Sequence, residues 1–190
     1  RTSLMLDSNN SKEGQIILVT SPGPGEGKTT TVANLAITYA NMGKKTLLVD
    51  ADLRKPVINK MFFSKKENIG LTNILSNNLT LKDCVLKSEA DNLNILSSGP
   101  TPPNPSELLS SSSMKKFISE IKKDYEIILF DTPPLIAVTD AFVITRYIDK
   151  FLLVIRASVT QKGALERSLV NMSNIEHSVT GVIFNGVNES

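Results

Sequence analysis

The stretch QIILVTSPGPGEGKTT, residues 15–30, decides the fold of this chain. Its first six residues are mainly apolar and rich in β-branched side chains, as in a short buried strand. A loop of proline and glycine follows, and residues 29–42 then repeat apolar side chains at three- and four-residue spacing, as in an amphipathic helix. Strand, glycine loop and helix in this order are the setting that a phosphate-binding loop requires.

The glycines of this loop allow its backbone to approach a phosphate and to turn N–H groups toward it. In this pattern the lysine reaches the β- and γ-phosphates of a nucleotide, and the following hydroxyl binds Mg²⁺. The strict pattern has its first glycine where this chain has Pro22, so that glycine is displaced by one position. The expected nucleotide-binding residues of the loop are Gly23, Gly25, Glu26, Gly27, Lys28, Thr29 and Thr30.

Apolar runs alternate with amphipathic stretches along the rest of the chain. Strands are expected at 15–20, 45–50, 93–97, 126–130, 151–155 and 181–185. Helices are expected at 29–42, 71–76, 81–87, 106–123, 140–148 and 162–175. Several strands are apolar on both faces, which is typical of strands covered on both sides. The pattern predicts an α/β fold over residues 1–190: a three-layer P-loop NTPase domain whose mostly parallel central sheet is covered by helices on both faces.

Two further strands end in acidic residues, at the sheet edge where ligands of such folds bind. Asp131 follows the apolar residues 127–130, as a Walker B aspartate that holds Mg²⁺ does. Asp50 and Asp52 end another strand, and the single residue between them puts both side chains on one side of an extended chain. Such a pair can share metal binding and accept the proton of an attacking hydroxyl. The alternative is a solvated loop whose aspartates cap a helix.

Two polar residues near these strand ends have two readings each. Arg54 comes directly after the acidic pair, and its charge could stabilise phosphate groups or orient an acidic partner. An exposed basic turn explains Arg54 equally well. Asn185 ends the last expected strand and could hydrogen-bond an adenine base, or it could simply be a β-turn asparagine.

Composition excludes several other classes of protein. The 190 residues are 41% hydrophobic and 21% charged, which is a globular composition. A formal net charge of +2 gives no electrostatic case for nucleic acid as the main partner. The single cysteine excludes an internal disulfide framework, and the single histidine excludes a histidine metal cluster. The longest apolar runs, such as residues 151–155, are too short to span a bilayer.

Three segments together resemble the bacterial tyrosine kinases of capsule and exopolysaccharide synthesis (BY-kinases), of the deviant P-loop group. They are residues 24–29 (PGEGKT), 47–56 (LLVDADLRKP) and 128–134 (ILFDTPP), which that family calls Walker A, Walker A′ and Walker B. A fourth segment, residues 99–109 (GPTPPNPSELL), resembles a further signature of the same family. The resemblance implies an enzyme that transfers the γ-phosphate of ATP to protein tyrosines with Mg²⁺ as cofactor.

The same resemblance implies roles for the site residues. Lys28 acts on the phosphates, and Thr29 binds Mg²⁺ together with Asp52 and Asp131. Asp50 is the candidate base for the tyrosine hydroxyl. The division of roles between Asp50 and Asp52 stays open at this point.

The family also implies partners and a location. Its members phosphorylate tyrosines in their own C-terminal tails, from neighbour to neighbour in a ring, as well as proteins of the polysaccharide pathway. They work at the cytoplasmic face of the bacterial cell membrane, with a membrane activator that is a separate protein or a fused domain. Residues 1–190 lack the family's tyrosine-rich tail, and residues 1–4 resemble only the end of its arginine-bearing N-terminal helix. We therefore expect a piece of a longer protein that is monomeric by itself.

Two other classes compete with the kinase. A partition or positioning ATPase of the same P-loop group shares the strand order and the aspartate pair. Such ATPases carry a signature lysine early in the loop, and this chain has Gly23 at that position. A non-enzymatic, nucleotide-switched scaffold is opposed by the intact lysine, threonine and three aspartates of the site. Phosphotyrosine formed on an added tyrosine peptide would favour the kinase, and free phosphate alone would favour the ATPase.

Overall fold

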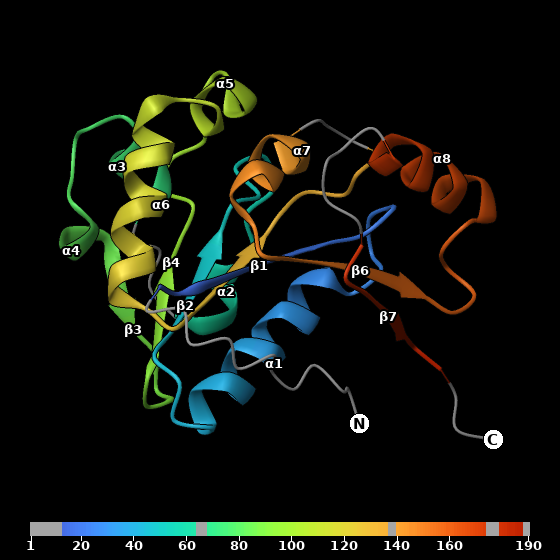
Figure 1. The fold of residues 1–190 in the computed structure, drawn as a ribbon, viewed down its shortest axis with the longest axis horizontal. Helices are drawn as coiled ribbons and strands as arrows, with labels where there is room; N and C mark the ends of the chain where they lie inside the picture. Colours follow the sequence, from blue (N-terminus) through green and yellow to red (C-terminus); the bar gives the residue numbers. More distant parts are fainter. Residues whose placement is uncertain (1–12, 64–67, 137–139, 174–178, 188–190) are drawn as a thin grey trace.

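The computed structural model describes residues 13–63, 68–136, 140–173 and 179–187 (Figure 1). The strands are β1 (Gln15–Thr20), β2 (Thr46–Asp50), β3 (Val85–Lys87), β4 (Leu93–Leu96), β5 (Ile127–Asp131), β6 (Lys150–Arg156) and β7 (Gly181–Asn185). Within these ranges they form one seven-stranded sheet in the order β3-β4-β2-β5-β1-β6-β7. All neighbouring strands are parallel except β3 and β4. The mostly parallel sheet confirms the predicted topology.

The helices cover both faces of this sheet. They are α1 (Lys28–Asn41), α2 (Ile58–Phe62), α3 (Leu71–Leu75), α4 (Leu81–Cys84), α5 (Pro105–Leu109), α6 (Ser112–Asp124), α7 (Asp140–Ile144), the 3-10 turn η1 (Thr145–Tyr147) and α8 (Lys162–Ser173). One apolar cluster joins α1 and α2 to one face of the sheet. The other cluster joins the opposite face to α3, α5, α6 and α7 (Figure 1). The three-layer α/β prediction is therefore confirmed.

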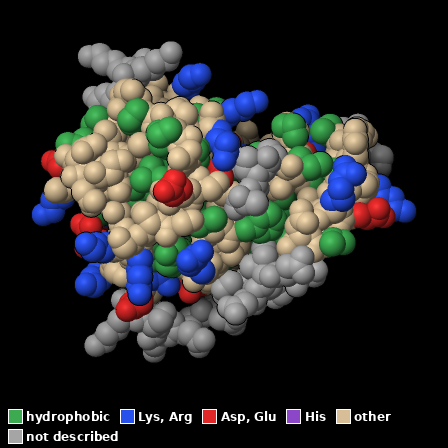
Figure 2. All heavy atoms as spheres, turned by 90° about the horizontal axis from the view of Figure 1, so that it is seen from above, with side chains coloured by type: hydrophobic (Ala, Val, Ile, Leu, Met, Phe, Trp, Pro, Cys, Tyr) green, Lys and Arg blue, Asp and Glu red, His purple; other side chains and the backbone are tan. Residues whose placement is uncertain are grey.

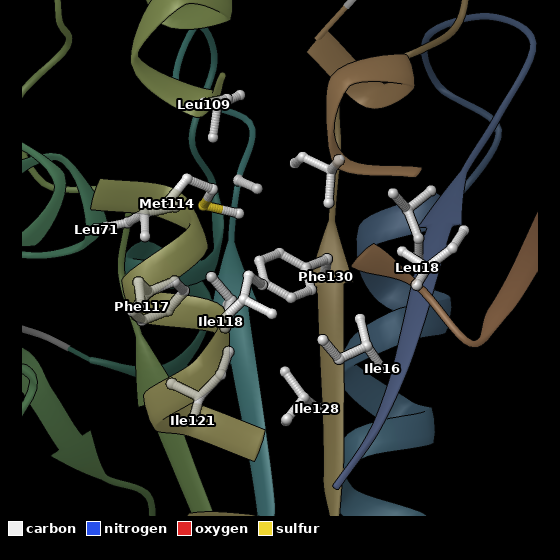
Figure 3. Packing of buried hydrophobic residues seen from close by; sticks show 14 of the residues in the cluster. Ile16, Leu18, Leu71, Leu109, Met114, Phe117, Ile118, Ile121, Ile128 and Phe130 are labelled. Carbon is white, nitrogen blue, oxygen red and sulfur yellow. The ribbon is translucent and has the colours of Figure 1, made fainter. Parts of the chain in front are cut away.

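The central strands β1, β2 and β5 alternate between these two clusters. In β5, Ile128 and Phe130 face one cluster, whereas Ile127 and Leu129 face the other. Figure 3 shows the cluster that contains Ile128 and Phe130. Phe117 of α6 lies on the same face of the sheet as these two side chains. Burial on both faces explains why the central residues of these strands are apolar at consecutive positions rather than at every second one.

The observed elements differ from the expected ones in three places. The helix expected at 106–123 is two helices, and the second begins after Ser111, whose hydroxyl accepts a hydrogen bond from the Met114 N–H. The helix expected at 81–87 ends at Cys84, and the next three residues form the antiparallel edge strand β3. The short helix α2 was not predicted.

Two observations describe the surface. On the face shown in Figure 2, Lys and Arg side chains lie among Asp and Glu side chains rather than in one field of a single sign. Among the described residues, no helix has the length and the apolar character needed to cross a membrane.

Phe117→Ala is expected to destabilise the fold by about 3–5 kcal/mol, because it removes a large, fully buried side chain and leaves a cavity. Lys116→Ala, on the exposed side of the same helix, is the matched control and is expected to stay within about 0.5 kcal/mol of the parent. Urea unfolding of the two variants measures the difference. Equal losses of unfolding free energy in the two variants would show that α6 does not anchor the helices on this face of the sheet.

Candidate active site

The phosphate loop connects β1 to α1 and adopts a conformation that requires glycine. Gly25 and Gly27 have φ values of 76° and 90°, in the left-handed region that other residues disfavour. At Gly27 the space is also closed, since a Cβ there would lie 2.2 Å from the Asn185 amide nitrogen. The loop therefore delivers the chain to the N-terminus of the 14-residue helix α1, where free N–H groups and the helix dipole favour an anion.

Lys28, Thr29 and Asp131 form the centre of the site. The Lys28 ammonium lies 2.9 Å from Asp131 Oδ1 and 3.1 Å from Thr29 Oγ1. The Thr29 hydroxyl donates a hydrogen bond of 2.7 Å to the other oxygen, Asp131 Oδ2. The predicted Walker A and Walker B residues, which are about a hundred positions apart in the sequence, are thus in direct contact.

Asp52 completes this arrangement from the segment just after β2. Its Oδ2 lies 3.6 Å from the Lys28 ammonium, and its Oδ1 accepts a hydrogen bond of 3.0 Å from the Lys55 N–H. The ammonium therefore lies between two carboxylates, those of Asp52 and Asp131. These three side chains come together because β1, β2 and β5 are adjacent parallel strands that end at the same edge of the sheet.

Asp50 is fully buried, whereas Asp52 and Lys28 are slightly exposed. Its Oδ2 accepts hydrogen bonds from the N–H groups of Val57 and Ile58, at the start of α2, and its Oδ1 accepts one from Asp52 N–H. Burial, followed by the charge of Asp131, raises the pKa of Asp50 to about 7. The carboxyl thus binds the first N–H groups of a helix, as in the capping alternative, and also lies beside the site.

Asp131 is also buried, and its pKa is raised by that burial. The Lys28 charge and the hydrogen bonds from Lys28 and Thr29 oppose this shift. The two carboxyls are paired in register on β2 and β5, so their charges add at one point of the sheet edge. A cationic ligand is favoured at such a point.

Asp50→Asn is expected to make the stability of the nucleotide-free protein less dependent on pH. The folded state holds the Asp50 proton more tightly than the unfolded state, because burial raises the pKa from 3.8 to about 7. The stabilisation linked to this proton is present below the unfolded pKa and is lost as the pH rises through about 7. Asparagine does not titrate, so the Tm difference, variant minus parent, should grow between about pH 4 and pH 8. A Tm difference that stays constant over this pH range would contradict the raised pKa of Asp50.

Arg54 forms an ion pair within the chain that could not be predicted from the sequence. Its Nε and Nη2 lie 2.8 and 3.2 Å from the two carboxylate oxygens of Asp140, which is fully buried at the start of α7. Ser106 of α5 also donates to Asp140. A buried carboxylate needs such partners. The contact gives the segment 99–109 a structural task, since its Ser106 ties α5 to α7.

The remaining predicted residues lie around the phosphate loop. Asn185 donates a hydrogen bond of 3.1 Å from Nδ2 to the Glu26 carbonyl, and its Oδ1 accepts one of 2.9 Å from Gly186 N–H. The Glu26 side chain is buried, whereas Thr30 is exposed in the first turn of α1. The adenine contact expected of Asn185 stays a prediction.

This fold and this site define a P-loop NTPase domain. Residues 14–180 match the family described as the AAA domain. Tyrosine-protein kinase YwqD of Bacillus subtilis (strain 168) is 42% identical over 170 residues, which are 90% of this chain and 71% of that protein. The kinase domain of the Escherichia coli tyrosine kinase ETK superposes with a TM-score of 0.88 at 29% identity, over 95% of this chain and 70% of that one.

A more distant likeness concerns the fold alone. The septum site-determining protein MinD from Pyrococcus horikoshii OT3, solved in complex with Mg-ADP, has a TM-score of 0.72 at 24% identity, over 90% of this chain and 70% of that one.

The chain belongs to the AAA domain family and, within it, to the bacterial tyrosine-protein kinases. The resemblance found in the Walker motifs is confirmed.

Proposed function

We propose that this chain binds Mg·ATP at residues 21–30 and transfers the γ-phosphate to tyrosines of proteins in capsule or exopolysaccharide synthesis. The observation that carries the proposal is the contact of Lys28 with Asp131 and Thr29, beside Asp52, at the end of the phosphate loop. A cation between two carboxylates, next to a helix N-terminus, suits a polyphosphate that arrives with its metal. Membership of the tyrosine-protein kinases supports the same reaction.

The donor atoms of the site fit Mg²⁺. Thr29 offers a hydroxyl oxygen, and Asp52 and Asp131 offer carboxylate oxygens, which are the ligands that hard cations prefer. The described part of the chain contains no group of three or more His, Cys, Asp or Glu side chains arranged as a metal cage. Mg²⁺ commonly binds through one or two carboxylates, together with phosphate oxygens and water. When bound, it would neutralise charge on the phosphates.

The nucleotide phosphates would lie against the backbone of Gly23, Gly25, Glu26, Gly27 and Thr30. Lys28 would turn from Asp131 toward the β- and γ-phosphates, where negative charge develops during transfer. Arg54 and Asn185 are further candidates for nucleotide contact. Their present hydrogen bonds to Asp140 and to Glu26 would then be shared or exchanged.

Asp50 is our candidate for the base. Its pKa of about 7 suits a group that must accept a proton near neutral pH. In the reaction the bond between the γ-phosphorus and the bridging oxygen of ATP breaks. A new bond forms to the tyrosine oxygen, and the hydroxyl proton passes to the carboxylate. Asp52 is the alternative acceptor, because its side chain is slightly exposed whereas that of Asp50 is fully buried.

The acceptor tyrosines are expected on flexible segments of other molecules. Tyr39 of α1 and Tyr125 after α6 are buried, and the Tyr125 hydroxyl accepts a hydrogen bond from Asn94. Tyr147 lies in η1, a structured turn. A reacting hydroxyl must reach the γ-phosphorus in line, which these three tyrosines cannot do from their places in the fold.

The natural partners that we propose are further copies of the full-length protein, arranged as a ring in which each tail reaches the next site. A membrane activator, either separate or fused, would keep the kinase at the inner face of the cell membrane. Residues 1–190 alone are then expected to be largely monomeric. Sedimentation of residues 1–190 beside a chain extended by a tyrosine-rich tail would test the assembly.

The test of the reaction is incubation with Mg·ATP and a flexible Glu/Tyr polymer, followed by mass spectrometry. Phosphotyrosine on the polymer is expected, and it should depend on both ATP and Mg²⁺. Release of free phosphate without phosphotyrosine would favour the partition-type ATPase instead.

A further inference from the structure

The phosphate loop contains a buried carboxylate that the proposed reaction does not use. The Glu26 side chain is only 2% exposed, although it belongs to a loop that receives anionic phosphates. A buried carboxylate is costly unless hydrogen-bond donors surround it. Its donors therefore indicate what holds this loop in place.

The hydrogen bonds around the Glu26 side chain all run toward its carboxylate. Its Oε2 accepts a bond of 2.9 Å from Gly23 N–H, three residues earlier in the same loop. Its Oε1 accepts a bond of 2.6 Å from the Thr160 hydroxyl, which lies in the turn after β6. The Thr160 oxygen in turn accepts a bond of 2.8 Å from Arg156 N–H. Because a backbone N–H can only donate, the Thr160 proton is left to point at Glu26.

Two further side chains hold the same part of the loop from the same flank. Arg156 Nη1 donates a bond of 3.1 Å to the Gly25 carbonyl, and Asn185 Nδ2 donates one of 3.1 Å to the Glu26 carbonyl. Arg156 and Asn185 are paired in register at the ends of β6 and β7. The β6–β7 side of the sheet thus holds the phosphate loop at the Gly25 and Glu26 carbonyls and, through Thr160, at the Glu26 carboxylate.

We propose that Thr160 is a positioning residue for nucleotide binding. Its hydroxyl holds the Glu26 carboxylate, and that carboxylate braces the loop by binding Gly23 N–H. The loop is then ordered before the nucleotide arrives, so that less ordering is needed on binding. This inference rests on the proposed function, because it takes the loop to be the site of the ATP phosphates.

The experiment compares Thr160→Val, which keeps the shape but removes the hydroxyl, with Thr160→Ser, which keeps the hydroxyl. Titration calorimetry measures the Kd of Mg·ADP, and transfer to the Glu/Tyr polymer gives kcat and the KM for ATP. Thr160→Val is expected to raise Kd and KM about tenfold with little change in kcat, since a hydrogen bond to a charged group that orders the ground state is lost. Thr160→Ser should recover most of this loss, and Val159→Ala controls for damage to the turn.

A second variant keeps the inference testable if Thr160→Val folds poorly. Glu26→Gln leaves only one acceptor oxygen for the two donors, so it should raise the same Kd and KM. The losses in the double variant should be clearly less than additive, because both changes break one chain of bonds. Wild-type affinity in Thr160→Val, equal losses in Thr160→Val and Thr160→Ser, or additive losses would each overturn the inference. Failure of the unaltered protein to bind Mg·ADP would instead refute the proposed function, and the inference with it.

Discussion

Lys28→Met is expected to reduce phosphotyrosine formation by several orders of magnitude. The variant lacks the cation that we propose for the β- and γ-phosphates, and such charge stabilisation is worth several kcal/mol in a site that excludes water. The structure adds a consequence within the protein. Asp131 loses its ion pair at 2.9 Å and keeps the hydrogen bond from the Thr29 hydroxyl, so protonation of Asp131 becomes easier.

The measurement is the rate of transfer to the Glu/Tyr polymer, with circular dichroism to establish that the variant is folded. Lys44→Met is the matched control, because Lys44 forms an exposed ion pair with Glu126 away from the site. It should keep the activity of the unaltered protein. A folded Lys28→Met protein with undiminished transfer would refute the assignment of the phosphate loop.

Asp131→Asn is expected to have the second largest effect, a fall in activity of about a hundredfold at low Mg²⁺ that excess metal partly restores. A neutral amide is a poorer ligand for a hard cation, and it also removes the counter-charge of Lys28. Titrating Mg²⁺ in the transfer assay measures the change. Asp83→Asn, in an exposed helix cap, is the control and should leave the metal dependence unaltered.

Titrating Mg·ADP into the two variants, beside the transfer assay, separates the roles of the two buried carboxyls. If Asp50 is the base, Asp50→Asn should lose turnover while keeping most of its affinity for Mg·ADP. Asp131→Asn should lose both. An equal loss of Mg·ADP affinity in the two variants would make Asp50 a metal ligand.

Much of this fold can be predicted from sequence because its centre has a local signature. The strands β1, β2 and β5 are short and have apolar centres; β2 and β5 end in aspartate, and β1 leads into the glycine-rich loop. Parallel strands carry their carboxyl ends at one edge, so the contact of Lys28 with Asp131 follows once the topology is right. The elements that were missed are weakly encoded. β3 has three residues, all at least partly exposed, and α2 has five.

The contacts around the centre of the site could not be predicted in the same way. Arg54 meets Asp140 across 86 positions of sequence, and Glu26 meets Thr160 across 134. Neither Asp140 nor Thr160 belongs to a motif with a chemical reason for its spacing. A single buried carboxylate at the start of a helix looks the same in sequence as an exposed cap. The partners of Asp140 and Glu26 depend on how α5, α7 and the turn after β6 fold onto the sheet.

The most direct test of the central claim is a crystal structure of this domain with Mg·ADP. Our account predicts the diphosphate against the backbone of residues 23–30, the Lys28 ammonium on a phosphate oxygen, and Mg²⁺ bound to the Thr29 hydroxyl near Asp131. Nucleotide bound elsewhere, or a metal held without Thr29 while Lys28 stays on Asp131, would contradict it.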